Sequence, residues 1–303
     1  MNIKKILIFL FIIVSQNLII SSSENLQKSK IITITRLYTF HITSKVNKLH
    51  TVIEIAQDYD KRQKVLNSYY PRYLTYFMTT GNTKFAVFDF HNIKDKQIRF
   101  SIIEKIILFK YDLEMAKILS TDNDKVSIDD NFKDQYLSNK NITLNLSIAK
   151  TITEKFNNNN EVELVKQLND YVLNNIEYEL RKDEWKGIYT YVFNKGKCID
   201  YADFLTALCR SKNIPARVIT GIVANKKEGN TGHAWLEVYF QKYGWVPFDP
   251  TFNDGSIKNT FEHLDDFYIY YCIGDYVYCN LKWWGKKGAK VVSTCKYWIK
   301  EEE

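Results

Sequence analysis

Residues 196–203 read GKCIDYAD, and this stretch decides the fold because it places a cysteine where a glycine turn runs into a helix. From Cys198 to Cys209 apolar residues recur at helical spacing, and the helix is predicted to end near Asn213, before the Ile-Pro pair at 214–215. A helix start offers unpaired backbone N–H groups and the positive end of the helix dipole. Both favour a thiolate and help to stabilise an oxyanion. Cys198 is therefore a candidate nucleophile.

A candidate base and a candidate orienting acid follow on two successive predicted strands. Residues 233–240 read HAWLEVYF and residues 244–251 read GWVPFDPT, so His233 begins the first strand and Asp249 ends the second. Alternate residues in both strands are apolar and form a predicted core face, which leaves His233 and Asp249 together on the opposite face. A short turn between the strands brings the two side chains within reach of an ion pair or hydrogen bond. With Cys198 they have the residue types of a catalytic triad.

The region around these residues resembles the transglutaminase-like superfamily in three blocks: G-x-C-x-D-Y-A with A-L-C-R and I-P-A-R-V after it (196–218), H-A-W-x-E-V (233–238) and G-W-x-P-x-D-P-T (244–251). The resemblance implies that Cys198 is the nucleophile, His233 the base and Asp249 the orienting acid. It implies a papain-like α+β core, in which the cysteine helix packs against an antiparallel sheet that carries the other two residues. It also implies acyl transfer on amide bonds through a thioester. Attack by an amine then gives cross-linking, and attack by water gives deamidation or proteolysis.

The family often completes its oxyanion hole with a side chain upstream of the cysteine. Tyr189 and Tyr191 are candidates for this role, and nothing in the sequence fixes the position. Arg210 and Arg217 are predicted to support packing or to pair with acids rather than to bind substrate. Glu237 is predicted to share the face of His233, either in the cleft or against the helix.

The whole chain is predicted to have three parts. Residues 1–23 are predicted to be a secretion signal, with two early lysines, an apolar run and three serines at the end. Residues 24–145 are predicted to form a β-rich, sandwich-like domain that ends in a polar connecting segment. Residues 146–303 are predicted to form the transglutaminase-like domain, in which the C-terminal stretch 267–299 contributes further strands. The predicted fold class is α+β.

Composition excludes several classes of function. The chain has 303 residues, of which 45% are hydrophobic and 15% aromatic, so it can bury a substantial core. A net charge of +7 without a dense basic stripe argues against a nucleic-acid partner. No CxxC pair or histidine-rich cluster appears, so neither a metal site nor a cofactor is expected.

All five cysteines lie in the second half of the chain. An odd number in an exported chain leaves at least one thiol unpaired, which agrees with a free nucleophile at Cys198. Cys209 lies on the apolar helix face and is predicted to be a buried, inert thiol. The choice of a disulfide pair among Cys272, Cys279 and Cys295 stays open.

Together these features predict an exported cysteine enzyme that acts on amide bonds of a peptide or protein substrate outside the cytoplasm or at the cell envelope. Attachment to a membrane is expected only if the N-terminal segment stays uncleaved. Hydrolysis is preferred to cross-linking, because the sequence shows no dedicated site for an amine substrate. The alternatives are a protein-glutamine cross-linking acyltransferase and a binding or assembly module that keeps the fold without turnover. The intact set of Cys198, His233 and Asp249 favours an enzyme.

Overall fold

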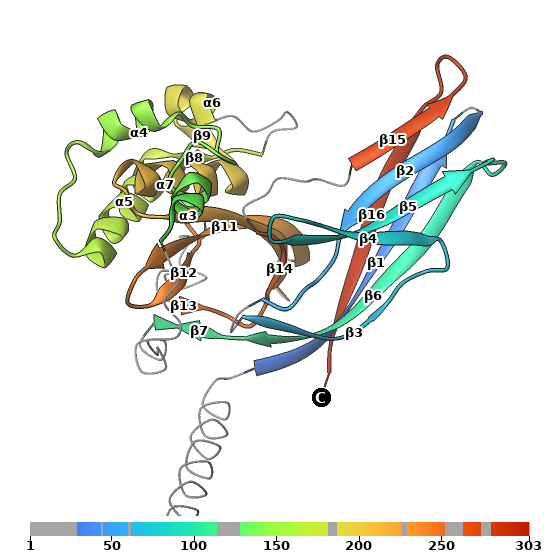
Figure 1. Cartoon of the computed structure of the whole chain (residues 1–303), viewed down its shortest axis with the longest axis horizontal. Helices are drawn as coiled ribbons and strands as arrows, with labels where there is room; N and C mark the ends of the chain where they lie inside the picture. Colours follow the sequence, from blue (N-terminus) through green and yellow to red (C-terminus); the bar gives the residue numbers. More distant parts are fainter. Residues whose placement is uncertain are drawn as a thin grey trace, which may run out of the picture.

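The computed structural model describes residues 29–43, 45–59, 62–113, 128–180, 187–225, 229–251, 263–273 and 280–302. These residues form a β-sandwich beside a domain of helices and strands (Figure 1). The predicted secretion signal, residues 1–23, lies outside the described residues. Within the described part of the chain, no helix has the length and apolar character needed to cross a membrane.

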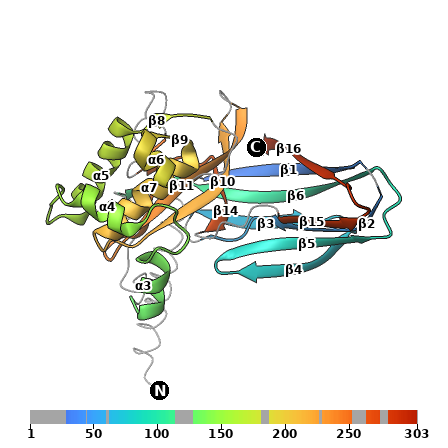
Figure 2. The same ribbon diagram turned by 90° about the horizontal axis from the view of Figure 1, so that it is seen from above.

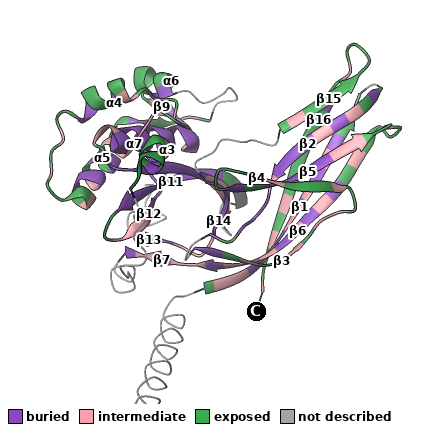
Figure 3. Cartoon of the chain, viewed as in Figure 1, coloured by how far each residue is buried: buried purple, intermediate pink, exposed green. Residues whose placement is uncertain are grey.

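Two four-stranded antiparallel sheets make the sandwich. The first has the strand order β16-β1-β6-β3 and the second the order β15-β2-β5-β4. The bounds are β1 (Ser29–Ile42), β2 (Val46–Glu54), β3 (Gln63–Tyr69), β4 (Leu74–Thr80), β5 (Thr83–His91), β6 (Gln97–Phe109), β15 (Asn280–Gly285) and β16 (Val291–Glu301). Buried residues alternate with more exposed ones along β1 and β6, as Figure 3 shows. Phe40, Leu49, Phe88 and Phe100 fill the space between the sheets. The predicted β-rich, sandwich-like part is confirmed.

The last two strands complete this sandwich. β16 pairs antiparallel with β1, from Ile42 opposite Val291 to Ile32 opposite Glu301, and β15 pairs with β2. The sequence placed all strands of 267–299 in the second domain, whereas the structure places only β14 (Tyr268–Ile273) there. The alternation of residues identifies a strand but not its partner, and β1 and β2 would otherwise present unpaired edges.

The second domain contains an antiparallel sheet of order β12-β11-β10-β14. Its strands are β10 (Ala216–Asn225), β11 (Gly229–Phe240), β12 (Gly244–Phe248) and β14. The helices α4 (Leu146–Thr153), α5 (Glu161–Asn175), α6 (Gly187–Phe193) and α7 (Cys198–Ser211) gather beside this sheet (Figures 1 and 2). Helix α7 contacts both β10 and β11. The predicted class, a helix packed on an antiparallel sheet with a β-rich domain before it, is confirmed.

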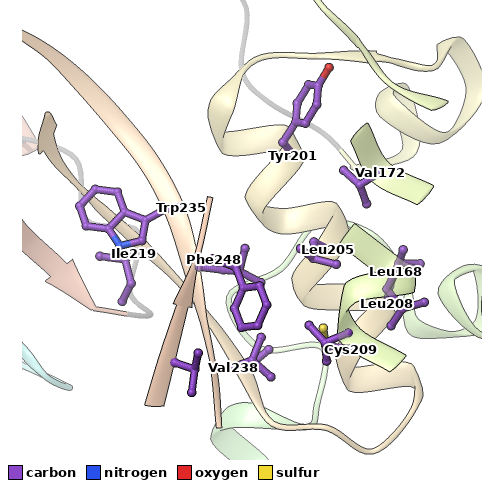
Figure 4. Packing of buried hydrophobic residues seen from close by; sticks show 14 of the residues in the cluster. Leu168, Val172, Tyr201, Leu205, Leu208, Cys209, Ile219, Trp235, Val238 and Phe248 are labelled. Carbon is purple, nitrogen blue, oxygen red and sulfur yellow. The ribbon is translucent and has the colours of Figure 1, made fainter. Parts of the chain in front are cut away.

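The core of the second domain lies between α7, α5 and the sheet. Leu205 and Leu208 of α7 lie near Leu168 of α5, while Val238 and Phe248 lie on the strands (Figure 4). Cys209 is fully buried in the same cluster, and burial raises the pKa of its thiol to about 12. The prediction that Cys209 is buried is therefore confirmed, and its thiol stays protonated at neutral pH.

An apolar interface joins the two domains. Ile32, Ile34 and Ile106 of the sandwich pack in one buried cluster with Ile222 and Ile269 of the second sheet. A separate polar connection runs from Arg62, whose guanidinium donates to the Trp245 carbonyl at 2.9 Å. These contacts fix one wall of the site described next, because β1 and β6 pack on β10 and β14, and β16 contacts β11.

Candidate active site

Cys198 is the first residue of α7, and the residues around it fit tightly. The Asp200 carboxylate accepts a hydrogen bond of 2.9 Å from the backbone N–H of Lys197, the N-cap residue. A Cβ atom at Gly196 would lie 2.7 Å from the Cβ of Asp200, so only glycine fits there. The helix ends at Ser211, and Asn213 follows with φ of 59°, close to the predicted end. The thiol of Cys198 is thus held at the start of a well-defined helix.

His233 and Asp249 form a buried pair on the neighbouring hairpin. The Nε2 atom of His233 lies 2.6 Å from Oδ2 of Asp249. The same carboxylate accepts hydrogen bonds from the Tyr268 hydroxyl at 2.8 Å and from the backbone N–H of Thr251 at 3.1 Å. Three donors therefore fix the orientation of Asp249, and Asp249 in turn fixes the imidazole ring.

The other side of the imidazole faces the cysteine, because the thiol of Cys198 hydrogen-bonds to His233. Burial alone would lower the pKa of His233, but the charge and hydrogen bond of Asp249, together with Cys198, outweigh it and raise this pKa to about 10. The ring is therefore an imidazolium at neutral pH, and a cation beside a cysteine favours the thiolate. The structure brings together all three residues that the sequence singled out.

The hairpin differs from the predicted arrangement in one respect. The sequence placed His233 and Asp249 on a face opposite the core, whereas every residue of 233–240 is buried. Leu236 lies opposite Phe248 in the strand pairing, as expected for two residues on the predicted apolar face. The second face is covered as well, because Tyr239 packs against helix α3 (Asp130–Tyr136) and Glu237 contacts Tyr59 of the sandwich domain. A single strand pattern does not show that a second domain covers the other face.

The charged residues beside the site have structural partners. Glu237 binds Arg217, with the Nη2 atom of Arg217 2.9 Å from Oε2 of Glu237. Arg210 donates to the backbone carbonyls of Ser138 and Ala216 at 2.7 and 2.9 Å. The prediction that both arginines support packing or pair with acids is confirmed. Glu237 neither lines the cleft nor packs on the helix, since Arg217 holds it.

The sequence did not identify Tyr178, the tyrosine that the structure brings to Cys198. Strand β8 (Glu177–Tyr178) pairs in parallel with β9 (Lys195–Gly196), so Tyr178 lies opposite Gly196. Its phenol oxygen accepts a hydrogen bond from the backbone N–H of Cys198. Of the two tyrosines proposed from the sequence, Tyr189 donates to Glu179 at 3.0 Å, and Tyr191 is 41% exposed. The position of Tyr178 beside Cys198 follows from the pairing of β8 with β9, and no local sequence pattern predicts it.

Two further features concern the cysteines outside the site and the possibility of a metal ion. Cys295 on β16 carries a free thiol, and Cys279 lies outside the described residues. Among the residues that the structure describes, no group of three or more His, Cys, Asp or Glu side chains is arranged to hold a metal ion.

The raised pKa of His233 predicts a specific titration. Because this pKa is above the value of about 6.5 for an unfolded chain, the imidazolium contributes stability that is fully present below pH 6.5. That contribution is lost as the pH rises toward 10. An NMR titration of the five histidine rings, with the His233 signal assigned from His233→Ala, should show one ring still protonated at pH 8. In Asp249→Asn the same ring should titrate at a clearly lower pH than in the wild type, because only Cys198 then opposes the effect of burial. A wild-type His233 that titrates near 6.5 would contradict the ion pair.

Comparison with known proteins finds a family model that matches the region of this site. Residues 147–250 match the sequence model of the transglutaminase-like superfamily. A stretch of 94 residues is 30% identical to the uncharacterised protein YebA of Bacillus subtilis (strain 168). That match covers 27% of this chain and 13% of the relative, so the chain spans a small part of the relative's length.

A solved structure from Cytophaga hutchinsonii, for which cysteine protease activity has been proposed, superimposes with a TM-score of 0.66 at 16% identity. The superposition covers 91% of this chain and 92% of that one. At this identity the likeness shows a shared fold, and it extends over both the sandwich and the helix-containing domain.

Proposed function

We propose that this chain, whose residues 147–250 form a domain of the transglutaminase-like superfamily, is a cysteine enzyme that acts on amide bonds of peptide or protein substrates. The observation that carries the proposal is the continuous contact from Asp249 through His233 to Cys198 at the start of α7. A merely structural pair would not require a thiol at the free end of the imidazole. The cysteine protease activity proposed for the Cytophaga protein of the same fold is compatible with this chemistry.

In the proposed mechanism the Cys198 thiolate attacks the amide carbonyl carbon and forms a C–S bond, which gives a tetrahedral oxyanion. His233 donates its proton to the amide nitrogen as the C–N bond breaks, so the amine leaves and a thioester remains. Water or an amine then attacks the thioester and gives a proton to His233, and the C–S bond breaks to restore the thiolate. Asp249 stabilises the imidazolium in each resting state and keeps Nε2 away from the substrate.

The Cys198 backbone N–H and the Tyr178 hydroxyl together provide the proposed oxyanion site. Because the phenol oxygen accepts from the N–H of Cys198, the O–H of Tyr178 is available to the substrate oxygen. Removing one oxyanion donor typically costs a factor of about 10² to 10³ in kcat.

We therefore expect Tyr178→Phe to lower kcat by about 10²-fold with little change in KM, because the donor acts mainly on the transition state. Tyr189→Phe is the matched control, since Tyr189 is also a tyrosine before the cysteine but donates to Glu179. Kinetics on any peptide that the wild type turns over would measure both variants. Equal kcat values for Tyr178→Phe and Tyr189→Phe would remove Tyr178 from the mechanism.

Hydrolysis is the preferred outcome, and cross-linking is the alternative. Mass spectrometry of glutamine-containing peptides, incubated with and without a primary amine, separates the two. Cleavage or a deamidated product supports hydrolysis, whereas incorporation of the amine without either product supports transfer.

We also propose that the protein acts outside the cytoplasm, on the basis of residues 1–23. Cell fractionation with mass spectrometry of the mature N-terminus tests this. A mature chain that begins after residue 23 supports export, and a chain that keeps this segment in the membrane fraction supports an anchored form.

A further inference from the structure

A pocket of about 430 Å³ opens at the candidate active site and has walls from both domains. Cys198 and His233 line it from the second domain, and Arg36 and Glu54 line it from β1 and β2 of the sandwich. The apolar interface of the two domains holds these walls together. A substrate bound at Cys198 therefore reaches residues of the sandwich domain.

Charged groups occupy the sandwich side of the pocket, where the neighbouring residues are apolar. Arg36 is only 2% exposed and lies in the inward row of β1 between Ile34 and Tyr38. Its guanidinium is 3.0 Å from the Glu104 carboxylate and donates to the Tyr38 hydroxyl at 2.9 Å. A buried ion pair is rarely more stable than apolar residues of the same size. Stability alone therefore does not account for charges beneath a pocket.

Glu54 is the acidic group of this region that the Arg36–Glu104 pair does not balance. Glu104 already accepts from Arg36, from the Tyr271 hydroxyl at 3.0 Å and from the Ala56 backbone N–H at 2.7 Å. The Oε2 atom of Glu54 is buried and, among the described residues, makes no hydrogen bond. A buried carboxyl oxygen without a hydrogen-bond donor destabilises the folded protein, because it has lost its contact with water and gained no partner. The pocket thus presents an acceptor that a ligand could satisfy.

We propose that this pocket is a specificity pocket for a substrate side chain that ends in a primary amine, with the ammonium group bound to Glu54. The proposal rests on the function proposed above for Cys198. Glu104 is the ion-pair partner of Arg36, so Glu54 is the carboxyl group of the lining that an ammonium group can pair with. Burial raises the pKa of Glu54, and an ammonium group bound beside it favours the ionised carboxylate. Lys197, another basic residue of the lining, is half-buried at the start of α7. Ile199, Ile222 and Ala234 provide apolar surface for the methylene groups of such a side chain.

Chloroacetamides of matched length test the proposal without a known substrate. The three reagents differ in the group on the amide nitrogen, which is aminobutyl, pentyl or carboxypropyl. With each reagent the Cys198 thiolate displaces chloride and forms a C–S bond. We expect the aminobutyl reagent to alkylate Cys198 about tenfold faster than the pentyl reagent, as a charged hydrogen bond provides. In Glu54→Gln, which keeps the side-chain shape, this ratio should fall to about one. Glu161→Gln, at an exposed acid of α5, should keep the wild-type ratio.

The possible outcomes distinguish a failure of the proposed pocket specificity from a failure of the proposed function of Cys198. Equal rates for the three reagents at a reactive Cys198 would overturn the proposed preference for a primary amine. A preference for the carboxypropyl reagent would also overturn it, because it would show that Arg36 binds the substrate side chain. A Cys198 that does not react with iodoacetamide faster than a free thiol would overturn the proposed function and, with it, the role of the pocket. The ratio measured on the wild type decides the matter even if Glu54→Gln does not fold.

Discussion

We expect Cys198→Ala to lower kcat/KM for amide hydrolysis by about 10⁴-fold or more, because the variant has no atom that can form the thioester. His233→Ala should cost about as much, since the cysteine then lacks both its counter-ion and the proton donor for the leaving amine. Groups that act as one unit are not additive. The double variant should therefore be no slower than either single variant.

Cys209→Ala is the matched control for this loss. Cys209 lies on the same helix, but it is fully buried in the core, and burial raises the pKa of its thiol to about 12. The variant should keep its activity while the free energy of unfolding falls by about 1 kcal/mol because of the small cavity. A Cys198→Ala enzyme with substantial residual turnover would place the nucleophile elsewhere.

The second large effect concerns stability. We expect Glu237→Ala to lower the free energy of unfolding by about 3–5 kcal/mol, because it leaves the Arg217 guanidinium buried without its counter-ion. The side chains of Arg217 and Glu237 are 7% and 1% exposed, and they are joined at 2.9 Å. Arg217 also lies 3.8 Å from the centre of the Trp245 ring and donates to the hydroxyl of Tyr59. The pair thus contributes to the contact between the domains.

Urea denaturation measures this effect, and an exposed ion pair provides the comparison. Lys166 and Glu163 lie 3.0 Å apart on α5, and the Glu163 side chain is 49% exposed. Glu163→Ala should change the free energy of unfolding by no more than about 0.5 kcal/mol. Replacing both Arg217 and Glu237 by apolar residues should cost less than Glu237→Ala alone. Equal effects at the exposed and the buried pair would show that Arg217 gains solvent when its partner is removed.

The sequence predicts features that neighbouring residues determine, and it does not predict those that depend on contacts between distant segments. The start of α7 at Cys198 and the facing of His233 and Asp249 follow from local spacing and strand parity, and the structure has both. Tyr178 was missed because its place depends on a parallel pairing with residues 195–196. The same limit applies to β15 and β16, whose partners lie more than 200 residues earlier in the chain.

The polar floor of the pocket illustrates the limit most clearly. Arg36 and Glu104 stand in strands that otherwise alternate regularly, so each could have been read as an exposed residue of an edge strand. Their burial follows from the packing of one sheet on another and on the second domain, which no single strand pattern contains. Glu54 acquires a role only because a second domain brings Cys198 to the same pocket.

The central claim is that Cys198 reacts as a thiolate paired with the His233 imidazolium. Alkylation by iodoacetamide at pH 6, followed by mass spectrometry and compared with free cysteine in the same solution, tests it most directly. An ordinary thiol with a pKa of about 8.5 is almost entirely protonated at this pH. We predict that Cys198 reacts at least about tenfold faster than free cysteine and that His233→Ala removes most of this difference. A Cys198 that reacts no faster than free cysteine would contradict the account and favour a binding module that keeps the fold without turnover.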